Sequence, residues 1–534
     1  MSSNFPPPGE QEILDSSGGD PQDVRGARPS RKAALAAGGI LAGVVIVGGA
    51  AWAASWYLSS GADAAEMLPD STLAFAQVNL DPSGEQKIEA LKTLNKFPAI
   101  RSELDLSSSS DVRKSLFEQI QKDGTCEDVD YDTDIAPWLG NRMAIAAIDT
   151  GEATPAPVGI VEITDEDKAK AGIDTLMNCG DDSGSGGIAI EGDWVVLAET
   201  DAIADDVVSD ALESNLADDA SYQRWMDEAG GDGIMSAYIA PSAAVKLADA
   251  LPGLLDSSGV DSEAALTDDQ TQELKDFEGA AMKLRFVDGS VEAEFAGDRS
   301  NNPFAKVITA SEGADVVGSL PVDTAFALGA SLGEGWLQTY LDEVAGALGS
   351  GDDLDAAMAE IEDQTGLALP EDIEALTGES FALAVSSDID VDALSNADDF
   401  SDVGVGMKVK GDPDAAEATL EKLRAQLPDE SWLLSKSSGD YLSFGPDQDW
   451  LDALSEDGGL GASSDYQQVI PQGDKSIYVV YANADAGDDW LVNALKDSGA
   501  EDDVIDNVAP LGAFGFSLWV DDDAVHASIK LSTD

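Results

Sequence analysis

The chain has 534 residues, of which 43% are hydrophobic, and its 104 acidic and 29 basic residues give a formal net charge of -75. A chain of this length is too long to fold around one ordinary hydrophobic core, so two or more globular units are expected. The charge excludes nucleic acid as a partner, because phosphate binding needs a basic surface, and it disfavours docking of the folded part on anionic lipid. It fits either a general adaptation to an ionic exterior or a surface that binds cations or a basic partner.

Residues 1–32 are rich in Pro, Gly, Ser and Asp and are predicted to form a disordered cytoplasmic tail. Residues 33–58 carry no charge and exceed the roughly 20 residues that a helix needs to span a bilayer. The charged residues nearest to this segment are Arg25, Arg28, Arg31 and Lys32 before it, and Asp63 and Glu66 after it. The positive-inside rule therefore predicts a single-pass plasma-membrane protein with a cytoplasmic N-terminus and an extracytoplasmic C-terminal domain.

Two further interpretations of this segment stay open. A signal peptide cleaved near Ala62 or Ala64 is the alternative to an uncleaved signal anchor, although the apolar stretch of a signal peptide usually has only about 7–15 residues. Gly39 and Gly43 form a G-x-x-x-G pair, which is a weak indication of helix dimerisation in the membrane.

Two similar phrases follow, "MLPDSTLAFAQVNL" from Met67 and "SLPVDTAFALGASL" from Ser319. Each opens with Leu-Pro and continues into a predicted apolar strand, at residues 73–80 and 325–330. Stretches with apolar residues at three- and four-residue spacing come next and predict helices. "IAPWLGNRMAIAAI" and "IEALTGESFALAVS" then each predict a short helix, a Gly turn and a strand.

The parallel continues through a strand and a helix in each part. In the second part Asp412 is expected to cap the helix, with Pro413 at its first position. Hairpins are predicted with turns at 191–193 and 438–440. "ASYQRW" then matches "SDYQQV", which places Tyr222 opposite Tyr466.

A two-strand hairpin closes each part, with turns at Asp288-Gly289, a strong type I′ signal, and at 521–523. The matching order of elements predicts an internal duplication with halves at 66–312 and 313–534. Because hairpins and alternating apolar and polar residues dominate, each half is expected to be an α+β repeat of mainly antiparallel sheets with packed helices.

The chain has two cysteines, Cys126 and Cys179, and neither has a counterpart in the second half. In an oxidising compartment they are expected to form a disulfide that staples the first half; two buried thiols are the alternative.

The apolar segment followed by "MLPDSTLAFAQVNLDPSGEQKIEALKTLNKFP" and "PWLGNRMAIAAI" resembles a bacterial family designated domain of unknown function 3352 (DUF3352). The resemblance covers most of the chain after about residue 60. It implies a membrane-associated bacterial protein with an exported domain, most often from actinobacteria, and it supplies no catalytic residues.

No enzyme motif stands out, and neither catalytic residues nor a cofactor are expected. His526 is the one histidine, too few for a common zinc site together with two cysteines, and its place in "AVHASIKL" indicates a solvent-facing or capping residue. Weak calcium candidates are the carboxylates at every second position of "DVDYDTD": Asp128, Asp130, Asp132 and Asp134. The match to an EF-hand calcium loop fails at its later positions, because Thr133 stands where the turn Gly belongs and Leu139 where the bidentate Glu belongs. A solvated acidic loop is therefore the favoured interpretation.

Two functions follow. The favoured one is a non-catalytic membrane protein whose acidic exported domain binds a ligand or a protein partner in the cell envelope, with an apolar ligand in a groove between the halves as one form of it. The alternative is an extracytoplasmic hydrolase that uses paired carboxylates, which predicts a concave pocket and a carboxyl of raised pKa.

Overall fold

A computed structural model describes residues 63–79, 84–103, 129–179, 186–246, 274–299, 314–388, 404–427 and 433–534, with short gaps, and scattered positions between 113 and 126. The predicted membrane segment 33–58 and the predicted tail 1–32 lie outside these residues. Within the described part of the chain, no helix has both the length and the apolar character needed to cross a membrane.

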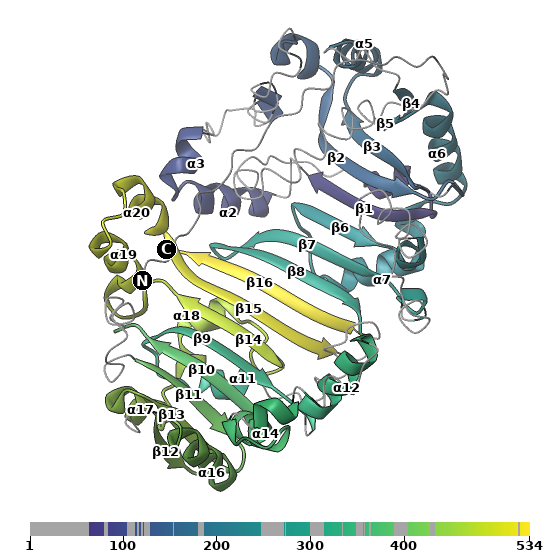
Figure 1. Ribbon diagram of the computed structural model, residues 1–534. Helices are drawn as coiled ribbons and strands as arrows, with labels where there is room; N and C mark the ends of the chain where they lie inside the picture. The colour runs from purple at the N-terminus through teal and green to yellow at the C-terminus, as the bar shows by residue number, and fades with distance from the viewer. Residues whose placement is uncertain are drawn as a thin grey trace, which may run out of the picture.

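One antiparallel sheet of 16 strands organises the described residues (Figure 1). Its first eight strands are β1 (Thr72–Asn79), β2 (Leu139–Ile148), β3 (Ala156–Ile163), β4 (Gly187–Glu191), β5 (Trp194–Ala198), β6 (Met235–Ile239), β7 (Ala280–Val287) and β8 (Ser290–Asp298). The others are β9 (Thr324–Ser331), β10 (Ser380–Ser386), β11 (Val405–Lys410), β12 (Leu434–Ser438), β13 (Tyr441–Gly445), β14 (Tyr478–Asn483), β15 (Leu511–Asp521) and β16 (Ala524–Thr533). The α+β class is confirmed, but a single sheet replaces the several sheets that were expected.

The order of strands is the same in the two parts of the sheet. The first part reads β4-β5-β3-β2-β1-β6-β7-β8 and the second reads β12-β13-β11-β10-β9-β14-β15-β16. The parts meet where β8 pairs with β16 in one continuous register, from Ser290 opposite Ser532 to Asp298 opposite Ala524. Backbone hydrogen bonds therefore run through the whole sheet without a break between the parts.

The repeated Leu-Pro phrase makes the same turn twice. Thr72 Oγ1 donates to the Pro69 carbonyl oxygen at 2.6 Å, and Thr324 Oγ1 donates to the Pro321 carbonyl oxygen at 2.7 Å. Because proline has no N–H and a fixed φ, it suits this entry into a strand, and the buried Thr hydroxyl finds a partner in the turn itself.

One face of the sheet, here called the helix-covered face, carries a similar helix layer in both parts. The layer consists of η2 (Ala64–Met67), α6 (Asp201–Glu213), η4 (Leu216–Asp218) and α7 (Ala220–Glu228), and of α11 (Ala314–Gly318), α17 (Gln448–Leu454), η6 (Leu460–Ala462) and α18 (Ser464–Val469). Tyr222 packs on Tyr238 with ring centroids 5.2 Å apart, and Tyr466 packs on Tyr481 at 5.3 Å. The pairing of Tyr222 with Tyr466 in the sequence thus corresponds to equivalent core positions.

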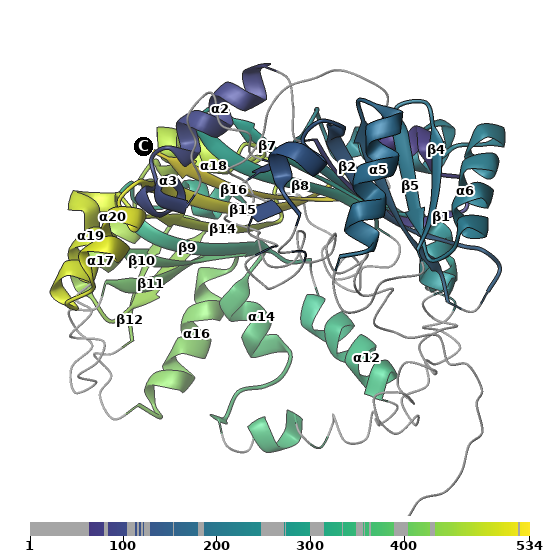
Figure 2. The same ribbon diagram turned by 90° about the horizontal axis from the view of Figure 1, so that it is seen from above.

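The opposite face is covered mainly toward the two ends of the sheet. Separate apolar clusters form there under α2 (Gly84–Leu94), α5 (Glu166–Met177) and α16 (Pro413–Arg424). Figure 2 shows α12 (Trp336–Leu348), α14 (Glu371–Thr377) and α16 together on one side of the sheet. The remaining helices are α3 (Pro98–Glu103), η3 (Tyr131–Ile135), α19 (Ala486–Asp497) and α20 (Asp502–Val508).

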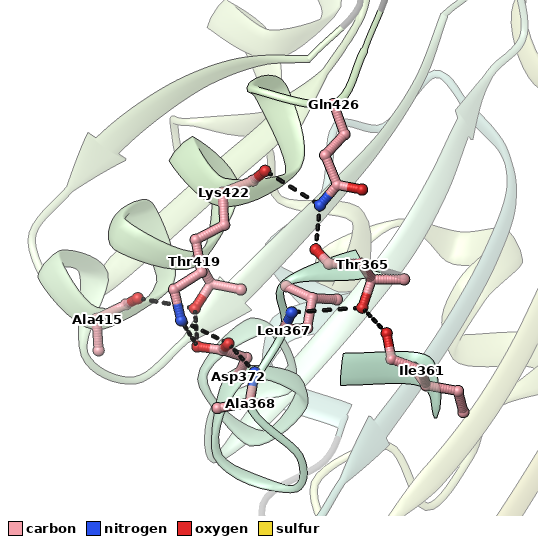
Figure 3. Close-up of polar contacts among 9 residues, drawn as sticks. All are labelled: Ile361, Thr365, Leu367, Ala368, Asp372, Ala415, Thr419, Lys422 and Gln426. Atoms are coloured by element: carbon pink, nitrogen blue, oxygen red, sulfur yellow. Dashed lines mark hydrogen bonds and ion pairs between the residues drawn. The ribbon is translucent and has the colours of Figure 1, made fainter. Parts of the chain in front are cut away.

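A buried carboxylate fixes α14 to α16. Lys422 Nζ lies 2.6 Å from Asp372 Oδ2, and Thr419 Oγ1 donates to Asp372 Oδ1 at 3.1 Å (Figure 3). Burial alone would raise the pKa of the Asp372 carboxyl, but the hydrogen bonds from Lys422, the Ala368 N–H and Thr419 outweigh it and lower the pKa. These contacts explain how a carboxylate only 8% exposed is tolerated.

Two local predictions are confirmed in detail. Asp288 and Gly289 have φ of 49° and 75°, the positive values that a type I′ turn requires. Asp412 accepts hydrogen bonds from the N–H groups of Asp414 and Ala415 and caps α16, with Pro413 in its first turn.

Candidate functional site

The central strands present a continuous apolar surface on the side opposite the helix-covered face. Cross-strand register places the alternate residues of neighbouring strands side by side on this surface, here called the apolar face. Its residues are Tyr478, Val480 and Ala482 of β14, Phe514, Phe516, Leu518 and Val520 of β15, Val525, Ala527, Ile529 and Leu531 of β16, Val291, Ala293 and Phe295 of β8, Met282 and Leu284 of β7, and Met235, Ala237 and Ile239 of β6.

Many of these side chains retain contact with solvent. Ile239 is 47% exposed and Ile529 is 38% exposed, and the others are half-buried. Met235, Leu284 and Val291, at one border of the face, pack against the apolar cluster under α2. The apolar face also crosses the β8–β16 junction, because Ile529 lies directly opposite Ala293. A contiguous apolar surface that stays partly open is typical of a site that binds an apolar molecule or another protein.

At the same strands the helix-covered face is unusually polar. Arg285 Nε lies 3.1 Å from Glu292 Oε2, and the Arg285 guanidinium also pairs with Glu294. From the second part of the sheet, Lys530 Nζ approaches Glu292 Oε2 to 3.9 Å. The Arg285, Glu292 and Lys530 side chains are at most 14% exposed, so the two parts of the sheet share a largely buried ionic network.

The polarity of the two faces is therefore inverted at the centre of the molecule. A half-covered antiparallel sheet normally turns its apolar residues to the covered side. Along β16 the more polar residues, His526, Ser528, Lys530 and Ser532, are the buried ones. The apolar residues of the same strand face the open side, which is the observation that singles out the apolar face as a candidate site.

The prediction that His526 faces solvent or caps an element is wrong. His526 is 5% exposed and stacks on Trp519 with ring centroids 5.1 Å apart and an angle of 5° between the planes. Its Nε2 lies 3.6 Å from Glu228 Oε2 of α7. The reason is the inverted polarity, since alternation along a strand gives two faces but does not say which one helices cover.

The acidic repeat at 128–134 does not gather its carboxylates around one point. Asp130 Oδ1 accepts a hydrogen bond from the Thr133 N–H at 3.0 Å, Asp132 pairs with Lys114, and Asp134 Oδ2 accepts from the Asp130 N–H at 2.9 Å. Asp128 lies outside the described residues. Where the chain is described, no group of three or more His, Cys, Asp or Glu side chains is arranged to hold a metal ion.

Cys126 and Cys179 are joined by a disulfide, with 5.0 Å between their Cα atoms. Cys179 follows the end of α5, and Cys126 belongs to the apolar cluster on which that helix packs. The disulfide therefore ties the segment before η3 to α5 in the first part of the sheet.

The hydrolase alternative predicts a concave pocket with a carboxyl of raised pKa. Burial raises the pKa of Asp63, and burial, a hydrogen bond with Asp534 and nearby negative charges raise the pKa of Asp485 to about 7. Neither of these carboxyls lines the hollow beside η3 or the hollow beside α6.

Sequence reasoning offered an apolar ligand as one hypothesis and did not identify the residues of the apolar face. The signal is present as two alternating strands, "FGFSLWV" and "VHASIKL", in which apolar residues alternate mainly with Gly, Ser, His and Lys, although Trp519 interrupts the pattern. Alternation of this kind also describes an ordinary half-buried strand, so only the arrangement of helices reveals that the apolar members stay open.

Comparison with known proteins gives a family and no activity. No curated protein and no solved structure matches the chain significantly. The sequence profile of "Protein of unknown function (DUF3352)" matches residues 39–185 and 158–440, which together span more than half of the 534 residues. With that coverage and the Leu-Pro turn that it encloses, the chain belongs to the DUF3352 family.

Proposed function

We propose that this chain is a non-catalytic, single-pass membrane protein whose acidic exported domain binds an apolar ligand in the cell envelope. The observation that carries the binding role is the apolar face, with its half-exposed aliphatic and aromatic side chains across the β8–β16 junction. Removal of apolar surface from water stabilises such a complex by roughly 25 cal/mol per Å². A ligand without charge suits this face, because the residues that form it carry none.

The membrane anchor is proposed from the uncharged segment 33–58 and the basic residues before it. The disulfide between Cys126 and Cys179 supports export, because disulfides persist in oxidising compartments. The acidic surface suits an ionic exterior, where salt screens repulsion between like charges.

An internal duplication is proposed to have formed the exported domain. The identical strand order, the two Leu-Pro turns and the two tyrosine pairs support this origin. The two overlapping matches to the family profile agree with it. In this proposal the ligand site arose where the two duplicated halves meet. The apolar face runs across β8 and β16, the edge strands of the two halves, which pair with each other.

Binding is tested with the uncharged fluorescent probe N-phenyl-1-naphthylamine and a truncated chain of residues 63–534. The double variant Ile239→Asn/Ile529→Asn should weaken binding about thirtyfold, since each side chain contributes about 1 kcal/mol of apolar contact. Val504→Asn on α20 is the matched control, because Val504 is 46% exposed but lies outside the apolar face. Equal affinity of wild type and double variant would contradict the proposed site.

Topology is tested by adding protease to intact cells that express the full chain. The proposal predicts degradation of the part after residue 62 and protection of a tag placed before residue 33. Protection of both parts, or loss of both, would contradict the proposed orientation.

A further inference from the structure

A second hollow lies beside α6, away from the apolar face. It has a volume of about 600 Å³ and is bounded by η2, by the β4–β5 turn and by the connection from α6 to η4. Its apolar lining includes Met67 and Trp194, both buried, and Leu212, which is 67% exposed. A leucine so exposed beside a hollow of this size offers a contact for one apolar side chain of a partner.

Carboxylates surround this apolar lining. Glu66 of η2, Glu191 and Asp193 of the β4–β5 turn, and Asp218 of η4 line the hollow and are exposed. Among the lining residues that the structure describes there is no Lys, Arg or His. The hollow, here called the acidic groove, therefore combines an apolar contact with a rim of one sign of charge.

The charge of Arg142, which lies over the Trp194 ring, is balanced by Glu162. The Arg142 guanidinium lies 5.4 Å from the centre of the Trp194 ring, but its Nη2 is 2.5 Å from Glu162 Oε1, and both side chains are at most 15% exposed. The Arg142–Glu162 pair is thus buried beneath the groove and leaves the negative charge of the rim in place.

The equivalent position in the second part of the sheet is built differently. There Tyr441 replaces Trp194 as the first residue after the turn, and Lys408 Nζ lies 5.2 Å from its ring. Lys408 also donates to the carbonyl oxygens of Ser319 at 3.2 Å and Glu456 at 2.8 Å. In the first part the register places the apolar Ile160 where Lys408 stands.

We infer that the acidic groove is a docking site for a short protein segment in which an apolar side chain is flanked by Lys or Arg. Charge complementarity identifies this occupant, since the rim attracts cations and the lining accepts an apolar group. The apolar side chain packs on Leu212, and the flanking cations pair with Glu191 and Asp193. This site is separate from the apolar face and does not rest on the function proposed for it.

The test uses the full chain in nanodiscs of the zwitterionic lipid phosphatidylcholine, with a fluorescein-labelled peptide of alternating Arg and Leu as the probe. Fluorescence anisotropy at physiological ionic strength measures its affinity, with empty nanodiscs as the background. The double variant Glu191→Gln/Asp193→Asn should bind about tenfold more weakly, because two exposed ion pairs contribute about 0.7 kcal/mol each. Leu212→Ser should weaken binding without changing the dependence on salt.

The matched control is Asp414→Asn/Glu421→Gln on α16, which removes the same charge from two exposed positions far along the sheet. A second peptide with Gln in place of Arg tests the need for cations. The inference is supported if only the groove variants weaken binding and the Gln peptide fails to bind. It is overturned if the control variant weakens binding equally, if the Gln peptide binds as well, or if the Arg-Leu peptide does not bind.

Discussion

Lys530 of β16 lies directly opposite Glu292 of β8, and its Nζ is 3.9 Å from Glu292 Oε2 in a largely buried setting. The carboxylate of Glu292 also pairs with Arg285 and accepts a hydrogen bond from Ser528 Oγ at 3.4 Å. One carboxylate therefore links cations from both parts of the sheet at the strand pair that joins them.

Replacing Glu292 with Ala should destabilise the protein by about 3–5 kcal/mol, because it leaves Lys530 and part of the charge on Arg285 buried without compensation. Urea unfolding of residues 63–534 measures this difference. Glu166→Ala is the control, since Glu166 pairs with Lys170 at the surface and its loss should change the free energy of unfolding far less. If both variants lose the same free energy of unfolding, the buried ionic network around Glu292 stabilises the protein no more than a surface ion pair does.

A side chain at Gly230, just after α7, should destabilise the protein. Its φ is +87°, and a Cβ there would lie 2.5 Å from Glu294 Oε2 and 2.8 Å from Arg285 Nη1. Gly230→Ala should cost about 2–4 kcal/mol through backbone strain and displacement of the ion pair. Gly192→Ala serves as the comparison, because its φ is also positive at +55° but nothing lies within 4 Å of a Cβ there. A similar loss at both positions would assign the cost to the backbone alone.

Cys126→Ser should lower stability by about 4 kcal/mol, the chain-entropy value for a sequence separation of 53 residues. Thermal unfolding with and without a reductant measures the effect. Reductant should bring the wild type to the level of the variant and leave the variant unchanged. If reductant breaks the bond in the wild type without lowering its melting temperature, the disulfide does not stabilise the folded protein.

The raised pKa of Asp485 makes a pH-dependent contribution to stability. Because the folded pKa of about 7 lies above the ordinary value, the folded state binds the proton more tightly. This contribution is complete below about pH 4 and is lost as pH rises through 7. Asp485→Asn should therefore raise the melting temperature relative to wild type at pH 8 more than at pH 5, whereas Asp206→Asn, an exposed position on α6, should shift it equally at both.

The net charge of -75 should make the folded state sensitive to salt. Repulsion between like charges is screened over about 30 Å at 0.01 M salt and about 3 Å at 1 M, so the melting temperature should rise steeply between these limits. Sucrose at matched osmolality controls for solvent exclusion. A melting temperature that does not change with salt would show that the surface carboxylates are neutralised within the fold.

Much of the local structure could be predicted because its causes are local. The positive φ values of Asp288 and Gly289 follow from two neighbouring residues, and the cap at Asp412 follows from three. The equivalence of Tyr222 and Tyr466 could be seen because the two parts of the chain repeat their order of elements. Each of these features depends on a few consecutive residues.

The β8–β16 junction and the apolar face depend on pairing between strands that are far apart in the sequence. Such pairing leaves no signal in the residues close to either strand. Residues 290–298 and 524–533 pair although more than 220 residues separate them in the chain, and neither strand's sequence identifies its partner. His526 shows the consequence, since its side chain is buried because α7 and α18 cover that side of the strand, not because of its neighbours in sequence. The open apolar face escaped prediction for the same reason.

The apolar ligand proposed for the apolar face is tested by mass spectrometry of what purifies with the full chain from its native membrane under mild conditions. We expect a recurring uncharged apolar molecule with the wild type that is lost with Ile239→Asn/Ile529→Asn and kept with Val504→Asn. Absence of such a molecule from the wild type, or its retention by the double variant, would show that the apolar face does not hold this ligand.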